Sequence, residues 1–329
     1  MQDPKTCQKD PLRDPLRSSS KSDLKSCQQE YRRSKWLLYG SQGWIASYFK
    51  KCVEKESDIE MVEGKSRCDD FSSLQQEIIS SRPDRVISFI GRTSAPSKEI
   101  ANIKDTSSST IDFLEKPGNL RINLRDNLYS PFLLEKICTK YDIHFTYLGT
   151  GCIFSYDDKD AKIPVQKEND APNFFGSSYS TVKGFTDMWM QLSTSTLNVR
   201  IRMPIVKEHS LKNFITKILS YDRIHSCLNS MTVLEDLLPV LVDLIKKRKV
   251  GTCHLVNPGP MTHNEILELY REIVDPNFIW INMTQEDISK TLLSKRSKCV
   301  LDTTTLSREY HIPTLRESLR KMFTAMVKL

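Results

Sequence analysis

Residues 36–46 read WLLYGSQGWIA, and this stretch decides the fold of the chain. Trp36–Tyr39 is a short apolar run that is typical of a buried parallel strand and ends at Gly40. Gly40, Gly43 and Ala46 then open a predicted helix with the spacing Gly-x-x-Gly-x-x-Ala. A strand, a glycine turn and a helix N-terminus in this order let the backbone approach a pyrophosphate, so we expect a dinucleotide-binding turn.

The form of the dinucleotide is predicted from the end of the second strand, expected at 59–62. The chain continues there as Glu63-Gly64-Lys65-Ser66-Arg67. A lone acid favours the free ribose hydroxyls of NADH, whereas Lys65 and Arg67 favour the 2′-phosphate of NADPH. Lys65 and Arg67 outnumber Glu63, so we predict NADPH rather than NADH, with plain surface charges as the alternative. The predicted cofactor contacts in these two stretches are Gly40, Gln42, Gly43, Trp44, Ile45 and Arg67.

Strands and helices are expected to alternate through the first two thirds of the chain. The predicted strands are 36–39, 59–62, 85–90, 144–148 and 197–202. The predicted helices are 44–56, 71–80, 128–141 and a segment ending near 192. This order implies an α/β fold with a Rossmann-like doubly wound parallel sheet.

We expect three parts along the chain. Residues 1–34 form a disordered N-terminal extension, rich in Ser, Lys, Asp and Gln. Residues 35–203 form an NADP-binding Rossmann domain that carries the catalytic Tyr and Lys, with a loop or insertion at 94–110. Residues 204–329 form mainly a smaller C-terminal substrate-binding lobe, with a long helix at 233–247 and some return to the sheet.

Composition excludes several classes of protein. Of 329 residues, 39% are hydrophobic and 27% charged, which is ordinary for a globular protein, and no apolar run is long enough to span a bilayer. The net charge of +7 is partly carried by residues 1–35, where both signs interleave, so we predict no nucleic-acid or membrane partner. Nine scattered cysteines suit reduced thiols in the cytoplasm, and the histidines have no metal-ligand spacing, so no metal is expected.

Residues 179–184 read YSTVKG and supply the clearest catalytic signal. Tyr179 and Lys183 lie four residues apart, so they share one face of a helix. An ammonium beside a phenol is expected to lower the tyrosine pKa, and such a tyrosine can exchange a proton with a carbonyl oxygen. A Tyr-x-x-x-Lys pair is more often a solvated helix face, and the glycine turn upstream makes the catalytic interpretation the better one.

The chain resembles the extended short-chain dehydrogenase/reductases, and within them the bifunctional nucleotide-4-keto-6-deoxyglucose 3,5-epimerase/4-reductases. The resemblance covers residues 35 to about 325. It is carried by YGSQGWI from Tyr39, TGCIF from Thr150, PNFFGSSYS from Pro172, RIRMPI from Arg200, NFITKI from Asn213, NSMT from Asn229, and NPG from Asn257 running on to HNEIL from His263.

The resemblance implies a role for each matching residue. Thr150 would hydrogen-bond the substrate carbonyl, Tyr179 would donate the proton, and Lys183 would hold the nicotinamide ribose and tune Tyr179. Gly91, Tyr179 and Lys183 would also contact the cofactor. Cys152 and Lys217 would carry the epimerisation. Asn127 would open the helix before the Thr150 strand. Substrate contacts are predicted at Asn173, Asn213, Asn229 and Arg296, where a surface salt bridge is the alternative for Arg296.

The implied reaction is nucleotide-rhamnose synthesis on a nucleotide-sugar substrate, by 3,5-epimerisation and NADPH-dependent reduction of carbon 4. Without the resemblance, Cys152 would be interpreted as a small buried residue and Lys217 as a solvated helix lysine. A monofunctional 4-dehydrorhamnose reductase and a non-catalytic NADP-binding regulatory subunit are the competing hypotheses. The sequence leaves UDP and dTDP sugars open, and the family implies a homodimer.

Overall fold

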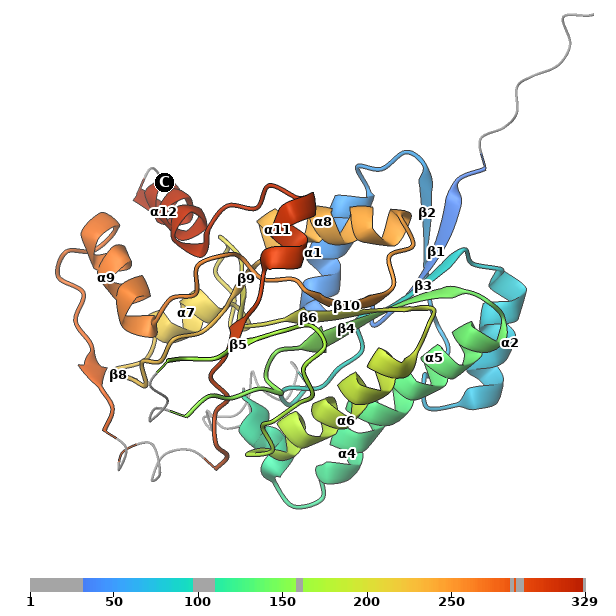
Figure 1. Ribbon diagram of the computed structural model, residues 1–329, viewed down its shortest axis with the longest axis horizontal. Coiled ribbons are helices and arrows are strands. Elements are labelled where there is room, and N and C mark those ends of the chain that lie inside the picture. The colour runs from blue at the N-terminus through green and yellow to red at the C-terminus, as the bar shows by residue number, and fades with distance from the viewer. Residues whose placement is uncertain (1–31, 97–109, 158–161, 285–286, 288–292, 328–329) are drawn as a thin grey trace, which may run out of the picture. The chain divides into compact units, whose positions relative to one another are not determined.

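The computed structural model describes residues 32–96, 110–157, 162–284, 287 and 293–327. Its centre is a parallel sheet of six strands in the order β10-β6-β4-β3-β1-β2 (Figure 1). The strands of this sheet are β1 (Ser34–Tyr39), β2 (Ile59–Glu63), β3 (Arg85–Ser88), β4 (His144–Thr150), β6 (Thr196–Ile201) and β10 (Gly251–His254). The predicted α/β fold with a doubly wound parallel sheet is confirmed.

Helices cover both faces of the sheet, and shorter elements complete the fold. The helices are α1 (Trp44–Val53), α2 (Phe71–Ser81), α4 (Leu120–Leu124), α5 (Ser130–Lys140), α6 (Ser178–Leu192), α7 (Phe214–Leu219), α8 (Leu234–Lys246), α9 (His263–Ile273), α11 (Thr304–Glu309) and α12 (Leu315–Val327). A 3₁₀ turn, η2 (Ile111–Glu115), and a π-helical turn, η3 (Arg125–Tyr129), flank α4. Three short parallel pairs join β5 (Val165–Gln166) to β12 (Val300–Leu301), β7 (Pro204–Ile205) to β9 (Thr232–Val233), and β8 (Arg223–Ile224) to β11 (Ile281–Asn282).

Alternate residues of β1 face two separate hydrophobic layers, as the period of a strand requires. Trp36 and Leu38 pack in the cluster that contains residues of α1 and α8. Leu37 and Tyr39 pack in the cluster that contains residues of α2, α5 and α6. Since both faces of β1 are covered from Trp36 to Tyr39, that part of the strand is a continuous run of buried residues instead of an alternating one.

The strand order reverses beside β1, and this places the site. From β1 the chain pairs with β2 on one side, and it then returns to add β3 on the other side. In open parallel sheets, ligands bind outside the carboxyl ends of the strands at the point where the strand order reverses. We therefore expect the binding crevice at the carboxyl ends of β1 and β3.

The C-terminal third has a hydrophobic cluster of its own and also returns to the sheet. Side chains of α7, α9 and α12 pack together around Met231 and Phe323. The strand β10 pairs with β6, and α8 packs against α1. Residues 33–329 form one compact unit, and the division at 203 and 204 stays a prediction.

Most predicted elements coincide with observed ones, and the differences are local. The third strand ends at Ser88 and not at residue 90. Asn127 lies inside the π turn between α4 and α5, so the expectation that it opens a helix is wrong. The predicted disordered extension falls mostly on residues 1–31, outside the described residues, and Ser34 already begins β1. None of the helices in the described ranges combines the length and apolar character that crossing a bilayer requires.

Candidate active site

The turn between β1 and α1 requires glycine at its first position. Gly40 has a φ of +75°, and a Cβ there would lie 2.8 Å from the carbonyl carbon of Phe89 and 2.9 Å from the nitrogen of Ile90. The chain after β3 thus crosses directly over Gly40 at the point where the strand order reverses. This contact fixes the tight turn that the sequence predicted.

The N-terminus of α1 presents free backbone donors toward this crevice. Gly43 is the N-cap residue, and no side chain caps the first turn that Trp44 and Ile45 begin. The N–H groups of that turn have no partner within the helix, and together with the helix dipole they favour an anion. The glycine turn and the uncapped helix fit the pyrophosphate of a nicotinamide dinucleotide.

Glu63 lies at the end of β2 and bonds to the same turn. Its carboxylate accepts hydrogen bonds from Ser41 Oγ and Gln42 Nε2, both at 3.0 Å, and pairs with Lys50 Nζ at 2.6 Å. Arg67 is exposed and pairs with Asp69 at 2.7 Å. The predicted contact Gln42 therefore holds Glu63, and Arg67 is held by an acidic neighbour.

Asn127 clamps the loop that follows β3. Its side chain accepts from Arg92 N and donates to the Arg92 carbonyl oxygen, both at 2.9 Å. A Cβ on Gly91 would lie 3.3 Å from Asn127 Oδ1. The π turn directs this amide at the loop, and such turns often occur at functional sites. Gly91 is thus held at the predicted cofactor crevice.

Thr150, Tyr179 and Lys183 are brought together by β4 and α6. Ser177 caps α6 by accepting a hydrogen bond from Ser180 N at 3.0 Å, which places Tyr179 in the first turn. The hydroxyl of Tyr179 forms a side-chain hydrogen bond with Thr150 at the end of β4. Lys183 lies one turn further along α6 and is buried with them.

Burial changes the acid–base properties of this pair in a direction that the sequence did not predict. Desolvation, followed by the nearby Cys152 sulfur, raises the pKa of Tyr179, and the Thr150 hydrogen bond only partly offsets this. Desolvation lowers the pKa of Lys183 to about 7, against the attraction of Asp187. Lys183 Nζ donates to Tyr147 Oη and lies 4.5 Å from the centre of its ring. The expectation that Lys183 lowers the Tyr179 pKa is therefore wrong for this arrangement.

A buried ion pair attaches α6 to the sheet. Arg200 on β6 binds Asp187 on α6 through Nη2 at 2.6 Å and Nε at 2.9 Å. Asn198 Nδ2 donates to the same carboxylate at 2.9 Å. This network fixes the position of the helix that carries Tyr179 and Lys183.

Cys152 lies beside this group, in the turn after β4. Its backbone nitrogen donates to Thr150 Oγ1 at 3.1 Å, and its sulfur accepts a hydrogen bond from Arg202 Nη1 at 3.2 Å. The sulfur acts electrostatically on both Tyr179 and Lys183. The structure therefore brings Cys152 together with Thr150, Tyr179 and Lys183.

Lys217 lies on α7, near Lys212 and Arg296. It is half-buried, and burial together with the neighbouring charges of Lys212 and Arg296 lowers its pKa. Ser297, next to Arg296, accepts from Arg202 Nη2 through its carbonyl oxygen at 2.6 Å. The segment 294–299 thus connects the surroundings of Lys217 with those of Cys152.

The predicted substrate contacts are mostly engaged with protein groups. Asn213 caps α7 at Ile215 N and donates to the carbonyl oxygens of Val206 and Glu208, at 2.8 and 3.0 Å. Asn229 accepts from Arg202 Nε at 3.0 Å and donates to Cys227. The side-chain amides of Asn213 and Asn229 are thus occupied by protein groups, so neither is available to bind a substrate in this arrangement.

The other two predicted contacts are only partly free. Asn173 is exposed and exchanges two hydrogen bonds with the backbone of Ser155, at 2.8 and 3.0 Å. Both Nη atoms of Arg296 bind the buried carboxylate of Asp112, at 2.7 and 2.9 Å, so Arg296 forms a partly buried ion pair in this structure.

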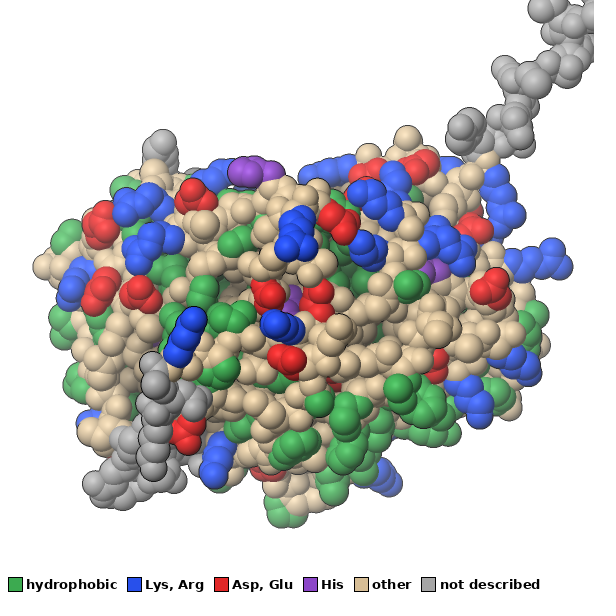
Figure 2. Space-filling model, in the orientation of Figure 1, with side chains coloured by type: hydrophobic (Ala, Val, Ile, Leu, Met, Phe, Trp, Pro, Cys, Tyr) green, Lys and Arg blue, Asp and Glu red, His purple; other side chains and the backbone are tan. Residues whose placement is uncertain are grey.

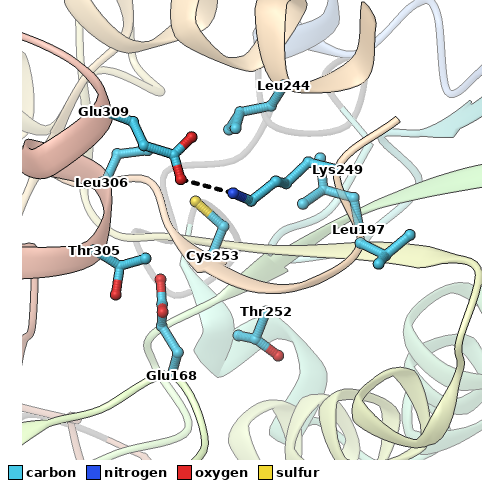
Figure 3. A pocket seen from close by; sticks show the side chains of 10 residues that line it. Glu168, Leu197, Leu244, Lys249, Thr252, Cys253, Thr305, Leu306 and Glu309 are labelled. Atoms are coloured by element: carbon cyan, nitrogen blue, oxygen red, sulfur yellow. Dashed lines mark hydrogen bonds and ion pairs between the residues drawn. The ribbon is translucent and has the colours of Figure 1, made fainter. Parts of the chain in front are cut away.

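A cavity of about 490 Å³ is lined by residues of several segments, and none of the predicted site residues is among them. Tyr156 and Cys227 line it, and both act on the charge of Arg202. A second, smaller cavity of about 30 Å³ is lined by Lys249 and Glu309, whose side chains form an ion pair at 2.7 Å (Figure 3). None of the predicted site residues lines this second cavity.

Sequence reasoning missed the residues that hold the catalytic candidates in place. Tyr147 contacts Lys183, and Arg202 contacts Cys152. Two arginines were an available signal, Arg200 in the buried strand β6 and Arg202 directly after it, since buried arginines are rare without a partner. No comparable signal marks Tyr147, because a tyrosine is ordinary in a buried strand.

The chain matches no family model. It is 46% identical over 295 residues to protein L780 of Acanthamoeba polyphaga mimivirus, a match that covers 89% of this chain and 98% of that protein. A crystal structure described as the L780 UDP-rhamnose synthase from the same virus matches with a TM-score of 0.82 and covers 99% of its chain. An Arabidopsis thaliana bifunctional dTDP-4-dehydrorhamnose 3,5-epimerase/reductase is 33% identical over 293 residues, which cover 87% of this chain and 91% of that protein.

Proposed function

The chain belongs to the family of nucleotide-rhamnose synthases that join a 3,5-epimerase to a 4-reductase, and we propose that it converts a nucleotide-4-keto-6-deoxyglucose to the nucleotide-L-rhamnose. We propose UDP as the nucleotide, which the description of the 46% identical relative supports. The single observation that carries the proposal is the grouping of Thr150, Tyr179, Lys183 and Cys152 at the end of β4.

The reduction uses Tyr179 as the proton donor. A bound reduced nicotinamide dinucleotide supplies the hydride to carbon 4. Because burial keeps Tyr179 protonated at neutral pH, its hydroxyl can give a proton to the carbonyl oxygen. Thr150 hydrogen-bonds Tyr179 and can share the same oxygen. Lys183 lies one turn away and would hold the nicotinamide ribose.

The epimerisation uses Cys152 and Lys217. The ketone at carbon 4 acidifies the protons on carbons 3 and 5, since the electron pair delocalises onto oxygen. Inversion needs one group to remove a proton and a second to return one on the opposite face. The lowered pKa of Lys217 suits it to this exchange near neutral pH. The enolate oxygen faces the same Tyr179 and Thr150, so one carbonyl serves both reactions.

We propose NADPH as the preferred dinucleotide, with Arg67 meeting its 2′-phosphate. Arg67 follows β2 and is exposed, as such a contact requires. The carboxylate of Glu63 opposes a second negative charge there, but its ion pair with Lys50 at 2.6 Å reduces that repulsion. NADH is the alternative that Glu63 favours.

We also propose a homodimer in the cytoplasm. Exposed apolar side chains gather over the region of α4, α5 and α6 (Figures 1 and 2). On α6 they include Phe185, Trp189 and Leu192, which are 53%, 42% and 79% exposed. A second copy would cover this face, and Trp189→Glu is expected to give a monomer by light scattering. The seven described cysteines are free thiols, which suits a reducing compartment.

The activity test uses the full chain with NADPH and either UDP- or dTDP-4-keto-6-deoxyglucose. We expect cofactor oxidation and a rhamnose product with the UDP sugar, identified by chromatography and NMR. Tyr179→Phe should reduce turnover at least about 100-fold. Tyr141→Phe, at an exposed tyrosine after α5, is the matched control and should turn over normally. Reduction of only the pre-epimerised sugar would contradict the proposal, as would cofactor binding without any turnover.

A further inference from the structure

Arg202 is a buried cation whose hydrogen-bond partners are all formally neutral in the described part of the chain. It is 1% exposed and follows the end of β6. Its guanidinium donates to Asn229 Oδ1 at 3.0 and 2.5 Å, and to the carbonyl oxygen and hydroxyl of Ser297 at 2.6 and 3.0 Å. The fifth contact is Cys152 Sγ at 3.2 Å. Arg200, two residues earlier, has a carboxylate partner in Asp187.

A buried cation held only by neutral groups is strongly attracted to any anion beside it. Amide and hydroxyl oxygens satisfy the N–H groups of Arg202 but leave its positive charge uncompensated. Of the groups that can become anionic, Cys152 is the one that accepts a hydrogen bond from the guanidinium. Ionisation of this thiol would turn the contact into a charge-assisted hydrogen bond.

The other thiols near Arg202 are placed differently. Cys299 is fully buried, donates to the carbonyl oxygen of Gly151 at 3.2 Å, and has a pKa raised by burial to about 11. Cys227 accepts from Asn229 Nδ2 at 3.1 Å. Cys152 alone of these three follows β4 beside Thr150, and it is partly exposed, so a substrate can reach it.

We propose that Arg202 is the positioning residue for Cys152: its buried guanidinium holds the sulfur where Cys152 can act as the base of the epimerisation. The titratable groups that face Cys152 from α6 are Tyr179 and Lys183, and Cys299 faces the same cluster from the residue before β12. Burial, followed by the Cys152 sulfur, raises the pKa of Tyr179, so the phenol keeps the proton that its role at oxygen 4 requires. This proposal rests on the proposed function.

Each inversion removes one proton from a carbon and returns one proton to the opposite face of that carbon. The Cys152 sulfur takes a proton from carbon 3 or 5, and the electron pair of that C–H bond moves onto oxygen 4 as an enolate. The Lys217 ammonium then gives a proton to the opposite face of the same carbon, and the carbonyl re-forms. Solvent water returns the proton from sulfur to the lysine amine, so no oxidant or reductant is consumed.

The test is the pH dependence of Cys152 alkylation by iodoacetamide, without substrate, read by mass spectrometry of the peptide that contains it. In Arg202→Met, alkylation at pH 7 should slow about tenfold, because the cation that attracts negative charge on the sulfur is gone. Arg202→Lys should restore most of the rate because it restores the charge. Ser297→Ala is the matched control, since it removes one hydrogen bond and keeps the charge, and its profile should equal that of the unaltered chain.

A second variant answers the objection that Arg202→Met fails to fold. Asn229→Asp keeps the shape of the side chain and places a carboxylate against Arg202, so it cancels the positive charge in place and should also slow alkylation. An unchanged pH profile in folded Arg202→Met, or in Asn229→Asp, would overturn the proposal. The pH profile could shift in the Arg202 variant while Cys152→Ala still epimerises the sugar normally. That result would confirm that Arg202 acts on Cys152 and would refute the epimerase role of Cys152.

Discussion

Burial moves the pKa values of Tyr179 and Lys183 in opposite directions, and this separates their roles. The pKa of Tyr179 is raised, so the phenol keeps its proton and can only act as an acid toward the ketone oxygen. The pKa of Lys183 falls to about 7, so its charge is easily changed by its surroundings. Burial away from water is the main cause of both effects: it keeps the Tyr179 phenol neutral, and it brings the pKa of the Lys183 ammonium close to neutral pH.

Arg67 is expected to set the preference for the phosphorylated dinucleotide. Arg67→Ala should raise the KM for NADPH about five- to tenfold and leave that for NADH unchanged, because only NADPH carries the 2′-phosphate. Steady-state kinetics with both cofactors measure this, with Lys140→Ala, at an exposed lysine that ends α5, as the control. Equal increases in KM for NADPH and NADH would show that Arg67 does not bind the 2′-phosphate.

The sequence predicts the reactive residues of the site better than the residues that hold them. Tyr179 and Lys183 are adjacent on a helix, so their spacing is sufficient to pair them. The contacts of Lys183 with Tyr147 and of Cys152 with Arg202 join different elements. Such contacts depend on how β4, β6 and α6 pack, which no local pattern contains.

Helix α6 is fixed to the sheet by one buried carboxylate. Asp187 receives Arg200, Asn198 and Gln191, and its side chain is 3% exposed. The same carboxylate stabilises the charged form of Lys183 one turn earlier. A single side chain therefore holds the helix in position and also contributes to the charge of Lys183.

Asp187→Asn should destabilise the chain by about 3 kcal/mol, because it leaves Arg200 buried without a counter-charge. Urea unfolding measures the change in free energy. Glu272→Gln breaks an exposed ion pair with Arg320, whose two side chains are 60% and 51% exposed, and should cost well under 1 kcal/mol. If the two variants lost equal stability, the anchoring role of Asp187 would be refuted.

Strands that contain a strong apolar run could be predicted from the sequence, whereas strands that form only because they pair with a neighbouring strand could not. β1 and β4 each contain a buried run with large apolar or aromatic side chains and lead into a glycine turn. β10 reads GTCH and is a strand because it pairs with β6, not because of its own propensity. The helix α9 was missed although Thr262 and Glu265 form a capping box before Ile266, a signal that the sequence carries. The π turn at Asn127 leaves no comparable signal.

Three buried histidines make the whole molecule sensitive to acid. Burial is the main cause that lowers the pKa of His144, His254 and His263 to about 4 each, from an ordinary value of 6.5. Between pH 6.5 and 4 the unfolded chain binds more protons than the folded one at these positions. Their stabilising effect is therefore complete above pH 6.5 and is lost as the pH falls toward 4.

The unfolding free energy should fall by about 2 kcal/mol for each of these histidines between pH 7 and 5. His144→Gln should remove about one third of that pH dependence, because His144 is one of the three. Thermal or urea unfolding at a series of pH values measures the slope. His311→Gln changes an exposed histidine and should leave the slope unchanged. A slope that stays the same in His144→Gln would contradict this account.

The most direct test of the account follows deuterium from solvent into the substrate. In D₂O without cofactor, the unaltered chain and the control Cys52→Ala should exchange the hydrogens at carbons 3 and 5 of UDP-4-keto-6-deoxyglucose. Cys152→Ala and Lys217→Met should lose that exchange and still reduce the pre-epimerised 4-keto-rhamnose, whereas Tyr179→Phe should exchange and not reduce. Full exchange in Cys152→Ala would contradict the claim that the sulfur beside Arg202 performs the inversion.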